Sequence, residues 1–157
     1  MRSQKIRRYL VEAKTPVVNA CKRWLSTILP YQPMDGRKEI IEAEYASGIL
    51  DYLKGVDELS RFSVVVGYCH YFKNKRAILE IGCSEGILQE RLDYSKYFRY
   101  VGVDISTETI RGASQKQDDK TTFIAEDASM YCPNELFYVI IFNECLEYFA
   151  DPLGLVL

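Results

Sequence analysis

Several features that identify common classes of protein are absent from this sequence. It has a single histidine, His70, and no Cys-x-x-Cys pair among its five scattered cysteines, so the ligand spacing of a structural zinc site is missing. It has no Gly-x-Gly-x-x-Gly fingerprint and no Gly-x-x-x-x-Gly-Lys loop, which argues against a nicotinamide enzyme and a P-loop hydrolase. Its longest apolar run, residues 136–142, is too short to span a bilayer. What remains is a globular chain of 157 residues, long enough for one domain with a real core.

Charge is unevenly distributed along the chain. Residues 1–29 contain seven basic residues and one acidic residue, Glu12, so this segment carries a net charge of +6 and the remainder carries −8 of the total of −2. We interpret the segment as a helical cap with a solvated basic face; the alternative is an arm for an anionic membrane surface or a nucleic acid. Glu12 and Lys14 interrupt any signal-peptide apolar region. With an odd number of scattered cysteines, reduced thiols and a cytoplasmic location are predicted.

The N-terminal third has helical periodicity. Apolar residues recur at helical spacing over residues 3–14, 17–28, 37–54 and 57–72. Two prolines and a glycine interrupt the pattern at residues 29–36, and Gly55 is placed to end the third helix. We therefore expect two regions: a helical cap over residues 1–56, and a second domain over residues 57–157.

After residue 76 the period changes, and short apolar segments alternate with amphipathic ones. The pattern predicts strands at residues 77–81, 100–105, 121–127 and 136–142, the last of them buried on both faces. It predicts helices at residues 85–94 and 106–115, the second beginning after Ser106 as N-cap. Strands that alternate with helices indicate an α/β fold with a parallel sheet, right-handed crossovers and helices on both faces.

The segment "AILEIGCSEG", residues 77–86, carries the strongest functional pattern. A strand that ends in a glycine turn and opens a helix creates a ligand site at the carboxyl edge of a parallel sheet. Gly82 permits a tight turn and a close ligand, Gly86 permits close packing, and free N–H groups at the helix start would point to the ligand. Glu80 would repel a pyrophosphate but suits a ligand with an ammonium group. The alternative is a turn that merely connects strand and helix.

Acids also follow the next two predicted strands. Asp104 lies about twenty residues past the glycines, where an acid accepts hydrogen bonds from ribose hydroxyls, and the neighbouring Ile105 is placed to press on an adenine face. Asp127 follows the third strand; it is placed to accept from an adenine amino group, while the N–H of Ala128 donates to a ring nitrogen. Three acids at successive strand ends are stronger evidence for a nucleoside-containing ligand than any one of them.

These segments, together with "VIIFNECLEYFADP" at residues 139–152, resemble the successive motifs of the class I S-adenosylmethionine-dependent methyltransferases. The likeness runs from about residue 78 to residue 152 and is nearest to the small-molecule branch that includes nodulation-factor and sugar methyltransferases. It implies S-adenosylmethionine as cofactor, S-adenosylhomocysteine as product, no metal, and a Rossmann-like sheet in the order 3-2-1-4. The segment "NECL" does not match the Asn/Asp-Pro-Pro-aromatic motif of DNA amino-methyltransferases, so no nucleic-acid partner is expected.

The resemblance also implies roles for individual positions. The cofactor contacts would be made by Arg61, Tyr68, Glu80, Gly82, Cys83 through its backbone, Gly86, Asp104, Ile105, Asp127, Ala128 and Asn143. The methionine part would lie near the first strand, its turn and Asn143; Arg61 would face its carboxylate and Tyr68, on the same helix face, would cover it. An ordinary surface or core position is the alternative for Arg61 and Tyr68. Asn143, Glu144 and Tyr148 are the catalytic candidates, with Glu147 a further possible base; a solvated helix start is the alternative for both glutamates.

The predicted reaction is in-line transfer of a methyl group to a hydroxyl or amine of a small molecule such as a saccharide, in which the protein chiefly orients the acceptor and excludes water. The usual family sheet has seven strands, and this sequence supplies four, so we expect a truncated chain, a fragment of a larger enzyme, or a chain that another molecule completes. The fourth strand would then be exposed or covered by a partner. A dimer through the open sheet edge is one form of such completion. The alternative function is a non-catalytic module that keeps the fold and acts by binding.

Overall fold

The computed structural model describes residues 33–72 and 76–156. The chain divides into two compact units, residues 1–33 and 34–157, and the description below concerns the second. The helices predicted within residues 3–28, and with them the basic arm, lie outside the described residues. The domain boundary after residue 56 stays a prediction; residues 34–56 belong to the second unit.

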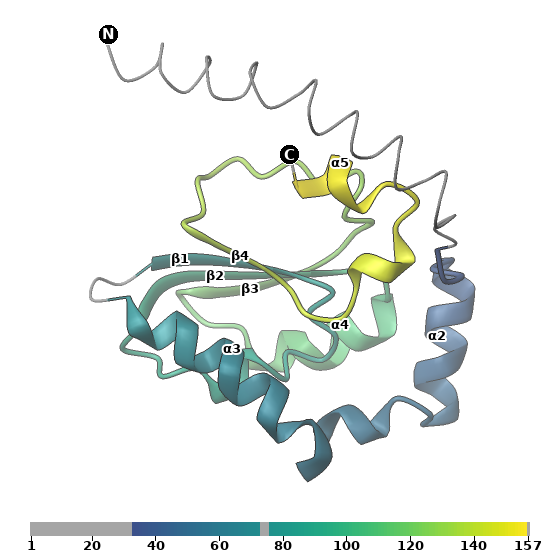
Figure 1. Cartoon of the computed structure of the whole chain (residues 1–157), viewed down its shortest axis with the longest axis horizontal. Coiled ribbons are helices and arrows are strands. Elements are labelled where there is room, and N and C mark those ends of the chain that lie inside the picture. Colours follow the sequence, from purple (N-terminus) through teal and green to yellow (C-terminus); the bar gives the residue numbers. More distant parts are fainter. Residues whose placement is uncertain (1–32, 73–75, 157) are drawn as a thin grey trace, which may run out of the picture. The chain divides into compact units, whose positions relative to one another are not determined.

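A parallel four-stranded sheet forms the centre of this unit (Figure 1). The strands are β1 (Arg76–Ile81), β2 (Tyr97–Asp104), β3 (Thr121–Ala125) and β4 (Val139–Phe142). Their order is β3-β2-β1-β4 and every neighbouring pair is parallel, as predicted. The four carboxyl ends therefore meet at one edge of the sheet.

The helices in the described part of the chain are short. They are α2 (Lys38–Ser47), η1 (Asp51–Lys54), η2 (Val56–Glu58), α3 (Leu59–Tyr71), η3 (Gln89–Arg91), α4 (Thr107–Ala113), η4 (Ser114–Lys116), η5 (Leu146–Tyr148) and α5 (Pro152–Val156), where η denotes a 3-10 turn. No helix among the described residues has the length and apolar content to cross a membrane. Ser106 is the N-cap of α4, as predicted; its hydroxyl accepts from the N–H of Thr109 at 3.3 Å. The single helix predicted over residues 37–54 is wrong, because Gly48 at φ +75° ends α2 in the left-handed conformation.

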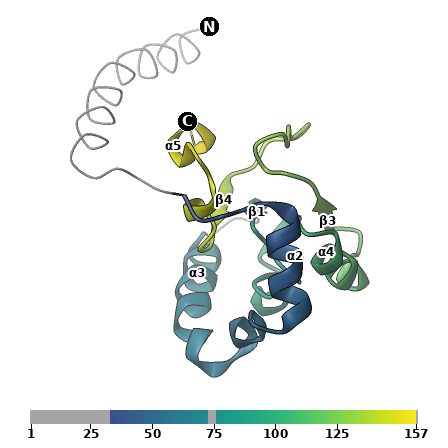
Figure 2. The ribbon, with the colours of Figure 1, turned by 90° about the vertical axis from the view of Figure 1, so that its right-hand side faces the viewer.

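The two faces of the sheet are covered differently (Figures 1 and 2). On one face, side chains such as Ile78, Tyr100 and Phe123 pack with buried residues of α3 and α4. On the other face, Leu79 and Val101 pack against the loop that follows β3 and against the segment around η5. Successive strand residues alternate between the two clusters, as the two-residue period of a strand requires. The first face is the more deeply buried of the two.

The helix predicted at residues 85–94 is wrong. The segment instead forms turns and the single 3-10 turn η3, after which Leu92 has an extended backbone. Ser84 and Gly86 both have positive φ, +51° and +78°, so the chain leaves the helical region before a helix can begin. The apolar residues of the pattern are still buried, Leu88 completely. The periodicity therefore identified the buried side chains but not the backbone that carries them.

The prediction that residues 136–142 form a strand buried on both faces is also wrong. β4 begins only at Val139. Ile141 is 8% exposed, whereas Ile140 is 56% exposed and Tyr138 is 67% exposed. β4 is an edge strand of the described sheet, paired with β1 alone, and no described element covers the side chain of Ile140. β4 therefore has the apolar composition that is typical of a central strand, although it lies at the edge of the described sheet.

Candidate functional site

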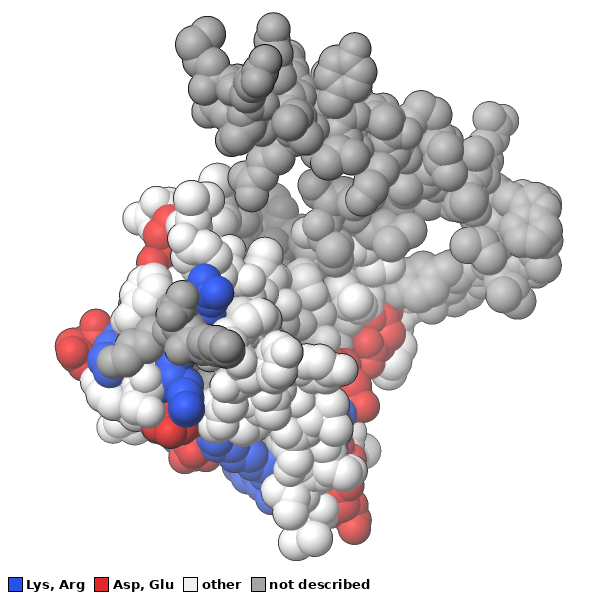
Figure 3. Space-filling model, turned by 60° about the vertical axis from the view of Figure 1, so that its left-hand side comes forward, with Lys and Arg blue, Asp and Glu red and all other residues white. Residues whose placement is uncertain are grey.

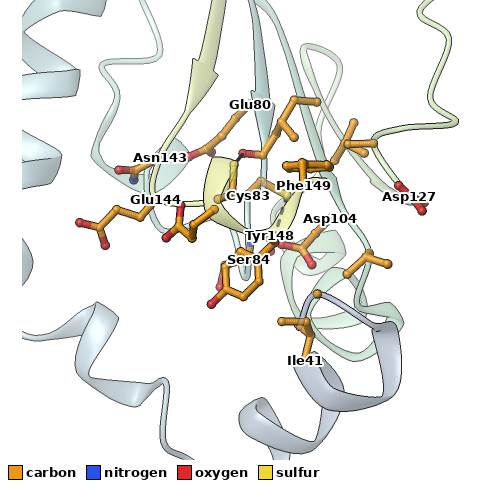
Figure 4. A pocket seen from close by; sticks show the side chains of 18 of the residues that line it. Ile41, Glu80, Cys83, Ser84, Asp104, Asp127, Asn143, Glu144, Tyr148 and Phe149 are labelled. Carbon is orange, nitrogen blue, oxygen red and sulfur yellow. Dashed lines mark hydrogen bonds between the residues drawn. The ribbon is translucent and has the colours of Figure 1, made fainter. Parts of the chain in front are cut away.

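A pocket of about 700 Å³ lies at the carboxyl edge of the sheet. Segments that follow all four strands contribute to its lining, and α2 adds Ile41 and Tyr45. In Figure 4, Asp127 lies at one end of the pocket, Asn143 and Glu144 lie at the other, and Asp104 lies between them. Its size is typical of pockets that hold a small molecule.

The turn after β1 is fixed to the end of β2 by its backbone. The N–H groups of Gly82 and Cys83 both donate to the carbonyl of Val103, at 2.8 and 3.2 Å, and that of Ser84 donates to Asp104 Oδ2 at 2.8 Å. Free N–H groups were expected at a helix start after this turn; there is no helix start, and β2 accepts the N–H groups of residues 82–84. Cys83 lines the pocket, but its N–H has a partner within the protein.

Both glycines of the turn are required by close contacts. Gly82 has φ +72°, and a Cβ placed on it would lie 2.7 Å from the Cβ of Cys145, on the segment after β4. Gly86 has φ +78°, and its Cβ would lie 2.8 Å from the ring of Phe123 in β3. Gly82 lines the pocket and Gly86 does not. Gly86 therefore packs closely against β3 and not, as predicted, as part of a helix against β1, and it lies outside the pocket in which a cofactor contact was predicted for it.

Glu80 lies at the bottom of the pocket and is 2% exposed. Its Oε2 accepts a hydrogen bond from the hydroxyl of Tyr100, a buried residue of β2. The pKa of Glu80 is raised to about 8, chiefly by burial and also by the charge of Asp104, while the hydrogen bond from Tyr100 and the charge of Arg61 act in the opposite direction. A cation in the pocket would favour the ionised form of this group.

Asp104 ends β2 and is also buried, with an exposed fraction of 8%. Each of its carboxylate oxygens accepts one backbone N–H: Oδ2 that of Ser84, and Oδ1 that of Ser106 at 2.9 Å. Burial raises the pKa of Asp104, and these hydrogen bonds oppose the shift. A carboxylate has about four acceptor positions, so two remain for the hydroxyl groups of a ligand.

The third acid, Asp127, lies in an exposed turn after β3. Its Oδ1 accepts from the N–H and the hydroxyl of Ser129, at 2.8 and 2.7 Å, and within the described residues Oδ2 has no partner. The N–H of Ala128 likewise makes no hydrogen bond in the described part of the chain. Ile105 and Ala128 both line the pocket. One acceptor, one donor and an apolar side chain are thus present where an adenine edge was predicted.

Arg61, on α3, lies at the opposite end of the pocket from Asp127 and links α3 to the segment that follows β4. Its Nη1 donates to Asn143 Oδ1 at 2.9 Å and lies 3.2 Å from Glu144 Oε2, and its Nε donates to Glu58 at 2.8 Å. Its Nη2 is enclosed and has no hydrogen-bond partner among the described residues. All three predicted residues at this end, Arg61, Asn143 and Glu144, line the pocket. The orphaned donor suits an anionic group of a ligand.

Tyr68 is not brought into the site. It is 71% exposed and does not line the pocket. Residues seven apart on a helix are separated by about 10 Å along its axis, which carries Tyr68 away from Arg61 toward the far end of α3. Tyr68 therefore does not reach the pocket, although it lies on the same face of the helix as Arg61.

Several lining residues were not predicted as part of the site. Tyr45 comes from α2, and its pKa is raised by burial and by the nearby Asp104. Helical spacing placed Ile41 and Tyr45 on an inward face, but nothing in the sequence says that this face looks onto the carboxyl edge of the sheet. Tyr148, which was predicted, packs against Gly36, and burial raises the pKa of its hydroxyl. Within the described residues, no group of three or more His, Cys, Asp and Glu side chains is arranged to hold a metal.

Comparison with known proteins identifies the family. A family model described as a methyltransferase domain matches residues 19–157. No curated protein matches the chain. Among solved structures, the plantazolicin methyltransferase BpumL in complex with SAH has 25% sequence identity and a TM-score of 0.55 over 71% of this chain and 44% of its own.

Two further structures share the fold. The N-methyltransferase NodS from Bradyrhizobium japonicum WM9, in complex with S-adenosyl-L-homocysteine, has 24% identity and a TM-score of 0.62 over 77% of this chain and 63% of its own. Magnesium protoporphyrin IX methyltransferase (ChlM) from Synechocystis PCC 6803, with bound SAM, has 17% identity and a TM-score of 0.60 over 78% of this chain and 69% of its own. The chain thus spans less than half the length of BpumL.

Proposed function

This chain belongs to the methyltransferase domain family, and from that premise we propose that its pocket binds S-adenosylmethionine and that the protein transfers the methyl group to a small molecule. The arrangement of three acids carries the proposal: Glu80, Asp104 and Asp127 come from three successive strands and line one pocket. BpumL, NodS and ChlM are described with SAH or SAM bound. A scaffold without a ligand has no need of these three carboxyl groups in one pocket.

The charges at the Asn143 end fit the amino-acid part of this cofactor. A buried carboxyl group, Glu80, suits the ammonium group, and the enclosed Nη2 of Arg61 suits the carboxylate. At the other end, Asp104 has two acceptor positions for the ribose hydroxyls, while Asp127 and Ala128 offer an acceptor and a donor to the adenine edge. The cofactor would therefore lie across the strand ends from Asn143 to Asp127.

We propose a hydroxyl or amine of a small molecule, such as a saccharide, as the methyl acceptor. The nearest support is NodS, which is named as an N-methyltransferase. Glu144 is the better candidate for a general base, because its side chain is 58% exposed and lies at the end of the pocket where the methyl group is expected. The raised pKa of Tyr148 keeps its hydroxyl protonated near neutral pH. Asn143, held by Arg61, would position the reacting groups.

The location and the binding partners that we propose for this protein are supported by less specific observations. The four described cysteines are free thiols, which supports a reducing, cytoplasmic location. On the face shown in Figure 3, acidic and basic side chains of the described residues are interspersed and much of the surface is uncharged. This pattern supports a small-molecule acceptor over a nucleic acid. Membrane contact through the basic segment of residues 1–29 remains a proposal.

A second candidate function is a module that acts by binding a partner at its open sheet edge. The exposed apolar side chains of Ile140 on β4 and of Tyr138 just before this strand favour it. Light scattering over a range of concentrations distinguishes the two candidates when it is combined with cofactor titration. A mass that doubles with concentration in a protein that binds no cofactor supports the module.

Calorimetric titration with S-adenosylmethionine and S-adenosylhomocysteine tests the principal proposal. Micromolar binding is expected, and Asp104→Asn is expected to weaken it at least about tenfold because the amide presents a donor where the ribose needs an acceptor. The matched control is Asp118→Asn, because Asp118 also accepts two backbone N–H groups, those of Lys120 and Thr121, but lies outside the pocket. Equal loss in both variants, or no binding by the folded wild type, would contradict the proposal.

A further inference from the structure

We propose that Tyr100 is a positioning residue for ligand binding. Its hydroxyl orients the carboxyl group of Glu80 toward the ammonium group of the cofactor and favours the ionised form of that carboxyl group. The inference rests on the proposed function. Tyr100 lies in the core and does not line the pocket, so it would act through Glu80 and not on the ligand itself. No sequence motif distinguishes it from the other eleven tyrosines.

The register of the sheet explains why these two side chains meet. Glu80 in β1 is directly opposite Gly102 in β2, and Tyr100 is two residues before Gly102 on the same face. A diagonal pair of this kind is within reach of a long side chain. Cys83 and Phe123 pack directly over Gly102, where a Cβ would lie 2.8 Å from each of them. The phenol ring of Tyr100 makes an edge contact with Phe123 and a tilted contact with Tyr97, at centroid distances of 5.9 and 6.1 Å.

The groups that face Glu80 leave Tyr100 as its direct donor. Arg61 on α3 favours the ionised form by its charge, and Asp104 at the end of β2 disfavours it. Three thiols also face it: Cys69 on α3, Cys83 in the turn and Cys145 after β4, whose pKa values burial raises, so all three are neutral. The described residues give Glu80 no other side-chain hydrogen bond than the one from Tyr100.

The balance at Glu80 makes that hydrogen bond consequential. Burial holds its pKa at about 8, so much of the group is protonated near neutral pH in the absence of ligand. A cationic ligand binds the carboxylate, and a donor that stabilises the carboxylate lowers the cost of ionising it. Removal of the Tyr100 hydroxyl should therefore weaken binding most at low pH and least at a pH above the pKa of Glu80.

Tyr97 supplies a matched control. It lies three residues earlier in β2, is equally buried, and contacts the ring of Tyr100. Its hydroxyl accepts from Gln89 Nε2 at 3.1 Å and lies 3.5 Å from Thr121 Oγ1, away from the pocket. Tyr97→Phe and Tyr100→Phe each remove one buried hydroxyl from the same strand. If the loss of a buried hydrogen bond were alone responsible for weaker binding, both variants would bind the cofactor more weakly.

The test is calorimetric titration of the full chain with S-adenosylmethionine at several pH values from about 6 to about 9, a range that brackets the titration of Glu80. Tyr100→Phe is expected to bind about tenfold more weakly than wild type at the lowest pH, with the deficit shrinking as pH rises, and Tyr97→Phe to stay within about twofold. In a Glu80→Gln background, the additional change Tyr100→Phe should have no further effect on affinity. Thermal unfolding of each variant verifies that it is folded.

The outcomes separate this inference from the function it rests on. If wild type binds and the two tyrosine variants have the same affinities at every pH, the role of Tyr100 is overturned and the proposed function stands. An additive effect of Tyr100→Phe in the Glu80→Gln background would likewise overturn it. If the folded wild type binds no cofactor, the proposed function fails, and the role of Tyr100 fails with it.

Discussion

The two levels of the pocket are built in different ways. The pocket floor, Glu80, Ser84 and Asp104, is buried, with exposed fractions of 2%, 8% and 8%. The pocket rim, Asp127 and Glu144, is exposed. Floor groups are bonded across strands: Tyr100 to Glu80, and Ser84 to Asp104. Asp127 is bonded within its own turn, and among the described residues Glu144 pairs only with the long side chain of Arg61.

The difference follows from the position of the strands. β1 and β2 each have a neighbour on both sides, while β3 and β4 are the edges of the described sheet. The floor is therefore part of the core, and a change there should alter the folding free energy as well as binding. A change at the rim should alter binding alone. The predictions below test this division, beginning with the largest expected effect.

Gly82→Val, in the turn that connects the floor residues Glu80 and Ser84, should be the most damaging substitution. A β-branched residue is strained at φ +72°, and its Cβ would lie 2.7 Å from the Cβ of Cys145. Strain and overpacking together predict a loss of about 4 kcal/mol or more, enough to abolish cooperative folding. Urea unfolding followed by circular dichroism measures it.

Gly67→Ala is the control for that substitution. Gly67 is in the middle of α3, and a Cβ there would meet no atom within 4 Å. Alanine has the higher helix propensity, so the variant should gain up to about 1 kcal/mol. If Gly67→Ala is destabilised, or if Gly82→Val unfolds like wild type, the two glycines do not differ in the way that their surroundings predict.

Two adjacent isoleucines in β4 sharpen the comparison within an edge strand. Ile141→Ala removes a side chain that is 8% exposed and should cost about 2–4 kcal/mol, whereas Ile140→Ala removes one that is 56% exposed and should stay within about 0.5 kcal/mol of wild type. Chemical denaturation of both variants checks this. Equal losses would mean that the outer face of β4 is covered in solution, as the partner-binding alternative requires.

Much of the fold follows from local pattern, and the parts that do not follow depend on tertiary contacts. Strand order, the N-cap Ser106 and the pocket position of Asp104 agree with the sequence analysis, and the family model confirms the family resemblance. The helix at residues 85–94 failed because positive φ at Ser84 and Gly86 depends on packing against β2 and β3. The prediction that residues 136–142 are buried on both faces failed, because the apolar composition of a segment does not say whether a neighbouring strand is present.

The site was predictable to a similar extent. The predicted residues at strand ends line the pocket, since parallel strands bring their carboxyl ends together, and their contacts with a cofactor stay predictions. Tyr68 failed because a shared helix face does not fix which end of the helix meets the pocket. Tyr45 and Tyr100 could not be recognised, because their contributions depend on the docking of α2 and on the register between β1 and β2.

The pH dependence of stability tests the burial of Glu80 directly. Its pKa rises from an ordinary value of 4.5 to about 8. Between these values the folded state holds a proton that the unfolded state has released, so the free energy of unfolding should fall as pH rises, by about 1.4 kcal/mol per pH unit. Glu80→Gln should flatten this dependence, and Glu108→Gln, at an exposed position, should leave it as it is. A wild-type stability that rises with pH across the window would contradict the burial.

Asp127→Ala should have the smallest effect on stability and still reduce cofactor affinity. The residue is exposed, and in the described part of the chain its carboxylate accepts hydrogen bonds only from Ser129 in the same turn, so the free energy of unfolding should change by less than about 1 kcal/mol. Loss of the acceptor to an adenine amino group should weaken S-adenosylmethionine binding about threefold to tenfold. Calorimetric titration and chemical denaturation of the same sample measure both quantities. If the free energy of unfolding falls together with the cofactor affinity, the rim also contributes to folding, and the division into a structural floor and a binding rim does not hold.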